Sequence, residues 1–226
     1  MSDLKIILTE DGSSSLINLE LNETYHSIHG AIQESEHVFI KHGLAFFVRQ
    51  KVSKEISIFE VGFGTGLNAL LALKYAQENC IKIRYTTIEA FPVDTLLIRE
   101  LNYPKTLAFE NSEKYFQKIH SAGWNKEEEI AAYFSIFKIN MGIQSAQLLP
   151  ENFDLVFFDA FAPDKQPEMW ELTILQKITE AMKPNGIFVT YSAKGQMKRD
   201  LISLGLSVEK LPGPPGKREM TRAIKP

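Results

Sequence analysis

Two short segments in which nearly every residue is apolar constrain the fold of this chain most strongly. They are EISIFEV at residues 55–61 and FDLVFFDAF at residues 153–161. A strand that is apolar on both sides must be covered on both faces, as in a parallel sheet between helices. Strand-like and helix-like segments alternate after residue 54, and an amphipathic helix is predicted over residues 167–186. The sequence therefore predicts an α/β, Rossmann-like fold with a mostly parallel sheet and helices on both faces.

The edges of this sheet are predicted from weaker signals. SVEKL at 207–211 and EMTRAIK at 219–225 predict an antiparallel C-terminal strand pair. Residues 124–140 begin with charges, which favours a loop or short helix, and end as a strand. We therefore expect seven strands in total. Residues 92–120 are predicted to be helical, with a break near Pro104.

The N-terminal part, residues 1–52, has a different pattern and is interpreted as a lead-in packed on the main domain, residues 53–226. The Asp11-Gly12 pair lies between short apolar runs and predicts a hairpin. Apolar residues at helical spacing then predict a helix over residues 29–47. A length of 226 residues with 44% hydrophobic residues suits one large domain with a sizeable core.

Several classes of protein are disfavoured by composition. One cysteine, Cys80, excludes an internal disulfide framework and a cysteine-rich zinc site, and the five histidines have no metal-ligand spacing. We therefore expect no metal. The first residues lack the pattern of a signal peptide, and no apolar run approaches the roughly 20 residues of a membrane span. We expect a cytoplasmic protein with no membrane partner.

A glycine-rich loop follows the first apolar strand. Gly62, Gly64 and Gly66 lie at the carboxyl end of that strand, the edge of an α/β sheet where ligands bind. Glu60 precedes the loop, and Glu89 ends the next strand, where it can accept hydrogen bonds from a ribose diol. The spacing differs from the Gly-x-Gly-x-x-Gly of dinucleotide sites. These residues favour S-adenosylmethionine over NAD, while a turn that holds no ligand remains the alternative.

Asp159 closes the second apolar strand and begins a stiff Ala-Phe-Ala-Pro turn. It is either a loop-capping carboxylate or a group that accepts a hydrogen bond from an incoming amine. A carboxylate with an ordinary pKa near 4 is a poor base, so we expect it to orient and desolvate a neutral amine. Phe161 and Pro163 are candidate pocket walls, and Trp170 is either a wall or core.

Charge is unevenly distributed along the chain. The net charge is −3, but residues 191–226 carry +5 and the remaining 190 residues carry −8. A local basic face on an acidic protein suits contact with phosphates, although ordinary solvated lysines are an equal alternative for any single residue. Lys217 and Arg218 lie in a GPPGKRE turn that is expected to overhang the ligand edge.

Three motifs resemble one known family. EVGFGTGLN, DAFAPDKQPEMW and GKREMTRA are similar to the methyltransferase half of the bacterial MnmC-type tRNA wobble-uridine enzymes, and ELNETYHSIHGAIQESEHVFIKHGL is similar to their lead-in. The likeness covers nearly the whole chain. It implies a class I methyltransferase that uses S-adenosylmethionine to methylate the amine of 5-aminomethyl-(2-thio)uridine in the tRNA anticodon. Many members carry a flavin-dependent oxidase domain, for which this chain is too short, so we expect a stand-alone form without flavin.

The resemblance also implies roles for particular residues. Those expected to line the methionine side of the cofactor are Glu60, Gly62, Phe63, Gly64, Thr65, Gly66 and Asn68. Glu89 would hold the ribose, residues 159–163 would face the reacting amine, and Lys217, Arg218 and Arg222 would hold the flanking phosphates. Related enzymes often have Gly-Asp near the adenine, whereas Ile143 follows Gly142 here. Adenine recognition is therefore assigned to backbone groups of Met141 and Gly142 or to Asn140.

Two other functions remain open from the sequence. One is a small-amine methyltransferase, or an aminopropyltransferase that uses decarboxylated cofactor. The other is a non-catalytic RNA-binding module, although such a module needs neither Glu89 nor Asp159. The oligomeric state is not fixed by any motif, and a monomer is favoured.

Overall fold

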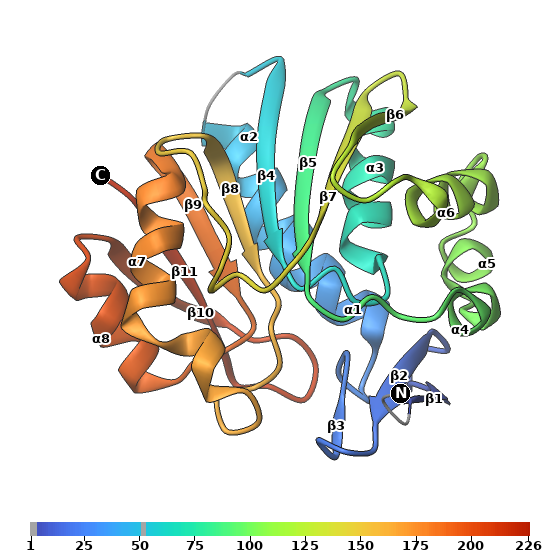
Figure 1. Cartoon of the computed structure of the whole chain (residues 1–226), viewed down its shortest axis with the longest axis horizontal. Helices are drawn as coiled ribbons and strands as arrows, with labels where there is room; N and C mark the ends of the chain where they lie inside the picture. The colour runs from blue at the N-terminus through green and yellow to red at the C-terminus, as the bar shows by residue number, and fades with distance from the viewer. Residues whose placement is uncertain (1–3, 51–52) are drawn as a thin grey trace.

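An eight-stranded sheet forms the centre of the protein in the computed structural model, which describes residues 4–50 and 53–226. The strand order is β10-β11-β9-β8-β4-β5-β7-β6 (Figure 1). In chain order the strands are β4 (Glu55–Val61), β5 (Lys82–Glu89), β6 (Glu127–Ala131), β7 (Phe134–Asn140), β8 (Phe153–Phe158), β9 (Met182–Thr190), β10 (Ser207–Pro212) and β11 (Glu219–Ile224).

The five central strands, from β9 to β7, are parallel to their neighbours. The predicted antiparallel pair β10–β11 lies at one edge, with β11 paired to β9. The predicted count of seven strands is wrong because β6 forms an antiparallel hairpin with β7 at the other edge. β6 begins Glu-Glu-Glu and only Ile130 of it is buried, so its charges indicated a loop. An edge strand can carry such charges because one side faces water.

Helices cover both faces of the sheet, as expected. One face carries α1 (Ala31–Ser35), η1 (Glu36–Leu44), α2 (Ala45–Gln50), α3 (Leu67–Asn79), α4 (Thr95–Glu100), α5 (Tyr103–Leu107) and α6 (Ser112–Ser121). The opposite face carries α7 (Leu172–Ala181), α8 (Gly195–Ser203) and the loop 141–152. Every residue of β8 is buried, with Leu155 and Phe157 in one core and Val156 and Phe158 in the other. The apolar pattern of this strand thus reflects cover on both faces.

Two predicted helices differ in detail. The break near Pro104 is confirmed, because Pro104 lies in the first turn of α5 and separate helices precede and follow it. The helix predicted over 167–186 is shorter: one 3₁₀ turn, η2 (Pro167–Trp170), precedes α7, and β9 begins at Met182. Across the described residues, no helix has the length and apolarity needed to cross a bilayer.

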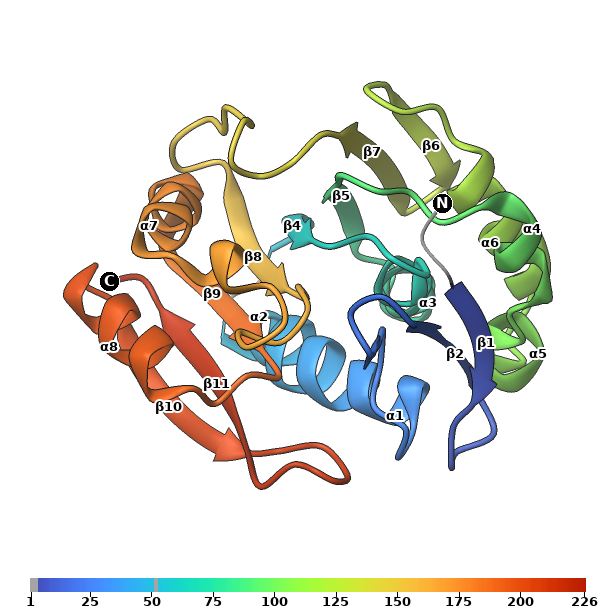
Figure 2. The ribbon, with the colours of Figure 1, turned by 60° about the horizontal axis from the view of Figure 1, so that its bottom comes forward.

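The N-terminal part forms a small sheet and one long helix. The predicted hairpin is present as β1 (Leu4–Leu8) and β2 (Ser14–Asn18), and β3 (Glu23–Thr24) extends it. Figures 1 and 2 show this small sheet beside the carboxyl ends of the parallel strands. We propose that residues 1–52 are a lead-in to one domain, residues 53–226; residues 51 and 52, at this boundary, lie outside the described part.

The lead-in helix is continuous from α1 to α2 but has a π-helical middle, η1. The backbone N–H of Ala45 donates to the carbonyl of Ile40, five residues earlier, instead of four. Val38, Phe39 and Leu44 of this segment are buried against β8, β9 and α3. The π geometry therefore lies within the packed interface and not at a frayed end.

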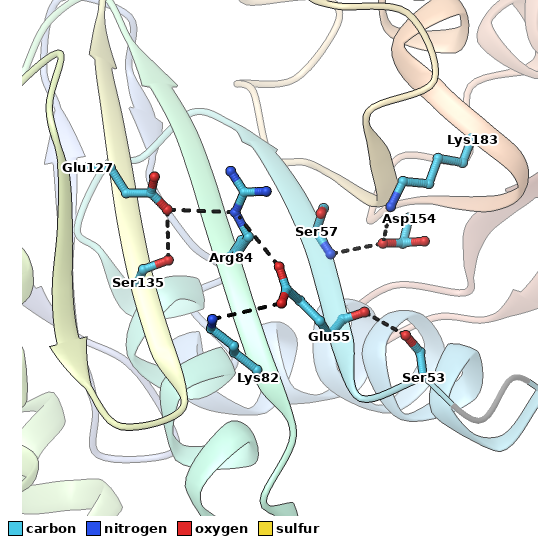
Figure 3. A network of polar contacts seen from close by, with 9 residues as sticks. All are labelled: Ser53, Glu55, Ser57, Lys82, Arg84, Glu127, Ser135, Asp154 and Lys183. Atoms are coloured by element: carbon cyan, nitrogen blue, oxygen red, sulfur yellow. Dashed lines mark hydrogen bonds and ion pairs between the residues drawn. The ribbon is translucent and has the colours of Figure 1, made fainter.

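Charged side chains form a network across the amino ends of the strands (Figure 3). Asp154, at the amino end of β8, is buried, with 5% of its surface exposed. Its Oδ2 accepts hydrogen bonds from the Ser57 backbone N–H at 2.9 Å and from Lys183 Nζ at 2.7 Å. Glu127 approaches Arg84 at 3.6 Å, but both side chains are more than half exposed.

We expect Asp154→Ala to lower the free energy of unfolding by about 2–3 kcal/mol, because it leaves a strand N–H and an ammonium without their acceptor. Glu127→Ala is the control and should change it by less than about 0.5 kcal/mol, since exposed ion pairs contribute little. Urea denaturation followed by circular dichroism measures both. Equal losses in the two variants would contradict the distinction.

Candidate functional site

A cavity of about 1140 Å³ opens at the carboxyl ends of β4, β5 and β8. Most ligand pockets measure roughly 300–1000 Å³, so this cavity has room for a cofactor and part of a second molecule. The predicted site residues that line it are Gly62, Phe63, Gly64, Thr65, Asn68, Glu89, Met141, Gly142, Asp159, Phe161 and Lys217. The structure thus brings together most of the residues that sequence reasoning selected.

The glycine loop has a left-handed backbone that favours glycine. Gly62, Gly64 and Gly66 have φ values of 90°, 48° and 71°. A Cβ on Gly62 would lie 2.5 Å from the backbone oxygen of Asp159, and one on Gly66 would lie 2.7 Å from His120 Nε2. Gly66 does not itself line the cavity. The glycines therefore allow the loop to approach the end of β8 closely, with backbone turned toward the cavity.

Two histidines, the buried His26 and the half-buried His120, hold this loop. His26 Nε2 lies 2.8 Å from Thr65 Oγ1, and His120 Nε2 donates to the Thr65 carbonyl at 3.2 Å. Burial lowers the pKa of His26 to about 4 and that of His120 to about 3, so both rings are neutral at neutral pH. Nothing local in the sequence links His26 to the loop 39 residues later.

Glu89 lies at the cavity beside the loop. Its carboxylate accepts hydrogen bonds from the backbone N–H groups of Gly64 at 3.1 Å and Phe91 at 2.8 Å. Burial raises its pKa. Two carboxylate oxygens have about four acceptor positions, so capacity remains for a ligand diol. Asn140, the alternative adenine contact, instead donates its side-chain amide to the Glu89 carbonyl and does not line the cavity, whereas Met141 and Gly142 do.

Glu60 does not make the direct contact that was predicted. It is fully buried beneath the loop, outside the cavity lining, and its Oε2 accepts a hydrogen bond from Thr87 Oγ1 at 2.7 Å. Burial raises its pKa to about 8, so it holds a proton at neutral pH. A neutral carboxyl behind the loop is not a counter-ion for a ligand ammonium. The prediction treated an acid in an apolar strand as a ligand contact, but Glu60 is fully buried within the sheet.

Asp159 occupies the cavity wall at the end of β8. Its Oδ2 accepts a hydrogen bond from Asn68 Nδ2 at 2.8 Å, and its backbone N–H donates to the Val61 carbonyl at 3.0 Å. Burial, and then the nearby Glu34 carboxylate, raise the pKa of Asp159 to about 7. No motif indicated a shift of this pKa from its ordinary value near 4. A carboxyl with this pKa can accept and release a proton at neutral pH.

Aromatic side chains form one wall beside Asp159. The Phe161 ring meets the Tyr25 ring edge-on, with ring centres 5.0 Å apart. Trp170 belongs to the core, where it packs on Phe158, but its Nε1–H donates to the Phe161 carbonyl at 2.8 Å and so fixes the turn. Pro163 does not line the cavity, and its prediction as a wall is wrong.

The lead-in completes the cavity, which sequence reasoning missed. Tyr25, His26 and Glu34 all line it. Lys165, in the loop after β8, donates its ammonium to the carbonyls of Leu21 at 3.0 Å and Asn22 at 3.2 Å. The small N-terminal sheet is thereby tied to the opposite wall of the cavity.

The three predicted phosphate contacts lie in different surroundings, and the prediction is wrong for the buried Arg222. Lys217 lines the cavity and forms an ion pair with Glu34. Arg222 is buried: its Nε donates to Glu209 at 2.6 Å and its guanidinium lies 3.4 Å from the centre of the Phe46 ring. Arg218 is exposed but outside the cavity lining.

Other basic side chains of this segment are also engaged within the protein. Lys198 pairs with Glu219, and Lys225 caps the end of α7 by donating to the carbonyls of Thr179 and Met182. Much of the positive charge of residues 191–226 is therefore used inside the fold. Charge counting along the chain could not separate these internal pairs from a free basic face.

The charge of the cavity favours cationic ligands. Its lining includes two lysines, Lys165 and Lys217, against six carboxyl groups: Glu20, Glu23, Glu34, Glu89, Asp159 and Glu168. Such a lining repels a pyrophosphate and attracts a ligand with sulfonium and ammonium groups. The residues therefore fit S-adenosylmethionine better than a dinucleotide. Within the described ranges, no three His, Cys, Asp or Glu side chains are placed to hold a metal ion.

Comparisons with known proteins agree with this chemistry. The MnmC bifunctional protein of tRNA 5-methylaminomethyl-2-thiouridine biosynthesis from Leptospira interrogans is 28% identical over 225 residues, which cover 95% of this chain and 34% of that protein. The same enzyme from Actinobacillus pleuropneumoniae is 26% identical over 234 residues, covering 97% and 35%. This chain thus spans about a third of the length of these curated relatives.

A solved structure is similar over almost the whole chain. The crystal structure of MNMC2 from Aquifex aeolicus superposes with a TM-score of 0.77 at 29% sequence identity, covering 99% of this chain and 70% of that one. A family described as S-adenosyl-L-methionine-dependent methyltransferase matches residues 108–226. That match includes more than half of the chain, which therefore belongs to this S-adenosyl-L-methionine-dependent methyltransferase family.

Proposed function

We propose that this methyltransferase methylates the amine of 5-aminomethyl-(2-thio)uridine at the wobble position of tRNA. The observation that carries the proposal is the position of Asp159, a carboxyl with a pKa near 7, in one cavity with the glycine loop and Glu89. The names of the similar MnmC proteins, which act in tRNA 5-methylaminomethyl-2-thiouridine biosynthesis, point to the same substrate class.

Three groups of residues would hold the cofactor. The Glu89 carboxylate would bind the ribose diol, the backbone of Gly62 to Thr65 would face the methionine part, and Met141 and Gly142 would border the adenine. When bound, S-adenosylmethionine supplies a methyl group on a positively charged sulfur. The glycine loop and Asp159 lie in close contact through Gly62, so the cofactor side and the proton-accepting side of the cavity are held together.

The chain must then convert an ammonium into a nucleophile. Asp159 would accept one proton from the substrate ammonium and become neutral. The nitrogen lone pair so released would then be free to accept the methyl group that S-adenosylmethionine would supply when bound, with neutral S-adenosylhomocysteine as the leaving group. Asn68, which donates to Asp159 Oδ2, would hold the carboxyl in one orientation. Tyr25 and Phe161 would exclude water and contact the base.

The wobble base would have to leave the anticodon stack to enter the cavity, as bases of RNA loops do readily. The acidic lining would accept the aminomethyl group and keep phosphates at the rim, where exposed side chains such as Arg218 lie. All the groups named here come from one chain, so we propose that a monomer is sufficient. A tRNA substrate would place the enzyme in the cytoplasm.

The same acidic cavity also favours a second candidate, methylation or aminopropylation of a free small amine. Free amines would bind such a lining without an RNA body. A non-catalytic RNA-binding role is not supported, because RNA binding alone needs no carboxyl with a pKa near neutrality inside the cavity.

Undermodified tRNA with labelled S-adenosylmethionine should yield label on the wobble aminomethyl nitrogen, measured by nucleoside mass spectrometry after digestion. Free polyamines should remain unlabelled, and tRNA binding should weaken steeply with salt because phosphates contribute to it. Label on free amines together with none on tRNA would favour the second candidate.

Asp159→Asn should reduce turnover by about 100-fold or more, because the proton acceptor is lost, with little change in cofactor affinity. In the wild type, turnover should fall as the pH drops through about 7, where Asp159 becomes protonated, and this decline should be absent in the variant. Asp164→Asn, in the same loop but exposed, is the control and should behave as the wild type. Normal turnover of Asp159→Asn would remove it from the mechanism.

Glu89→Gln should weaken cofactor binding by about tenfold, because a charged acceptor for the ribose diol becomes neutral. Isothermal titration calorimetry with S-adenosylhomocysteine measures the effect without catalysis. Glu129→Gln, on the edge strand β6, is a matched control with no expected change. If Glu89→Gln binds as tightly as the wild type, the ribose is held elsewhere.

A further inference from the structure

An ion pair in the wall of the cavity is not used by the mechanism above. It joins Glu34, in α1 of the lead-in, to Lys217, in the loop between β10 and β11. The Glu34 side chain is 6% exposed and that of Lys217 is 32% exposed, and both residues line the cavity that contains Asp159. Two opposite charges therefore face the proposed proton acceptor from different parts of the chain.

The surroundings of the pair fix both partners. Glu34 Oε1 accepts a hydrogen bond from the Ser27 backbone N–H at 2.9 Å, which leaves Oε2 for Lys217. The Lys217 ammonium lies 3.8 Å from the centre of the Tyr191 ring, a cation–π contact. Tyr191 in turn donates its hydroxyl to the carbonyl of Ala160, the residue after Asp159. The pair is thus built into the wall next to Asp159.

The two partners act on Asp159 in opposite directions. The negative charge of Glu34 raises the pKa of Asp159, beyond the increase caused by burial, and the positive charge of Lys217 lowers it. With both present, the effects partly cancel. Removing one partner leaves the other charge uncompensated in a buried environment, where charges interact strongly.

We propose that the Glu34–Lys217 pair sets the protonation of Asp159 through its two charges. The pair thereby sets the pH range in which the enzyme takes a proton from its amine substrate. The proposal rests on the proposed function for the role of that proton. In the step concerned, the proton leaves the substrate ammonium for the Asp159 carboxylate, which leaves a neutral amine and a neutral carboxylic acid. Glu34 and Lys217 take no part in this proton transfer.

Other polar groups face Asp159 from the elements around it. They are Glu60 of β4, Asn68 of α3, Tyr85 of β5, Tyr103 of α5 and Tyr191 after β9. Glu60 and the three tyrosines have pKa values raised above their ordinary ranges and are neutral at neutral pH. Among these groups and the pair, Glu34 and Lys217 are the two that act on Asp159 as charges.

The test compares Glu34→Gln, Lys217→Met and the double variant by ¹³C NMR titration of labelled aspartate in the ligand-free protein, with Asp159→Asn to assign the signal. Glu34→Gln should lower the pKa of Asp159 by about one unit, and Lys217→Met should raise it by a similar amount. The double variant should return close to the wild-type value. With tRNA substrate, the acidic limb of the turnover profile should shift in the same directions.

These outcomes separate control of charge from a structural role. A pair that only holds the wall together would, when broken, change both single variants in the same direction, and the double variant would not recover; that result would overturn the proposal. Titrations that do not differ among the variants would overturn it as well. Thermal melting confirms folding, and Lys217→Gln carries the same expectation if Lys217→Met does not fold.

The proposed function can fail separately. Opposite titration shifts in a protein that transfers no methyl group to tRNA would contradict the substrate assignment and support the control of Asp159 by the pair. Methyl transfer to tRNA with unchanged titrations would support the substrate assignment and contradict the control of Asp159 by the pair.

Discussion

The parallel pairing of β4 with β5 on one side and β8 on the other is the constraint on which the site depends. It continues past the strand ends, where the Gly62 N–H donates to the Ile88 carbonyl and the Asp159 N–H donates to the Val61 carbonyl, each at 3.0 Å. These two bonds bring the glycine loop against the residue that carries the proton-accepting carboxyl. Because the contact is between backbones, it fixes the two parts of the cavity independently of side-chain rotamers.

Burial is the second general influence on the site. It disfavours the charged form of the titratable groups around the loop. Glu60 and Asp159 hold protons more strongly than in water, and His26 and His120 hold them less strongly, because the charged form of each loses its hydration. At neutral pH Glu60, His26 and His120 are therefore uncharged. A small number of charges in the cavity walls can then change the pKa of Asp159 strongly, since little solvent is present to screen them.

The sequence was sufficient to predict what is local. The buried strands, the glycine loop, Glu89 and Asp159 each have a signal within a few residues, and the alternation of strands and helices places their ends at one edge. Contacts between distant segments had no such signal: Glu34 and Lys217 are 183 residues apart, and His26 contacts Thr65 39 residues later. Strand β6 was missed because an exposed edge strand has the composition of a loop. The acidity of Asp159 depends on burial, which no motif expresses.

The number of residues in the π-helical segment of the lead-in determines which way Glu34 points. Glu34 lies just before Glu36–Leu44, and Phe39 and Leu44 within that segment are fixed against the sheet. Each residue of an α-helix turns the chain by about 100°. Loss of one residue from the segment would relax it toward an α-helix, keep the core packing, and rotate Glu34 away from the cavity. In related sequences, the number of residues between the positions of Glu34 and Phe39 should therefore vary less than the identities of the residues between them.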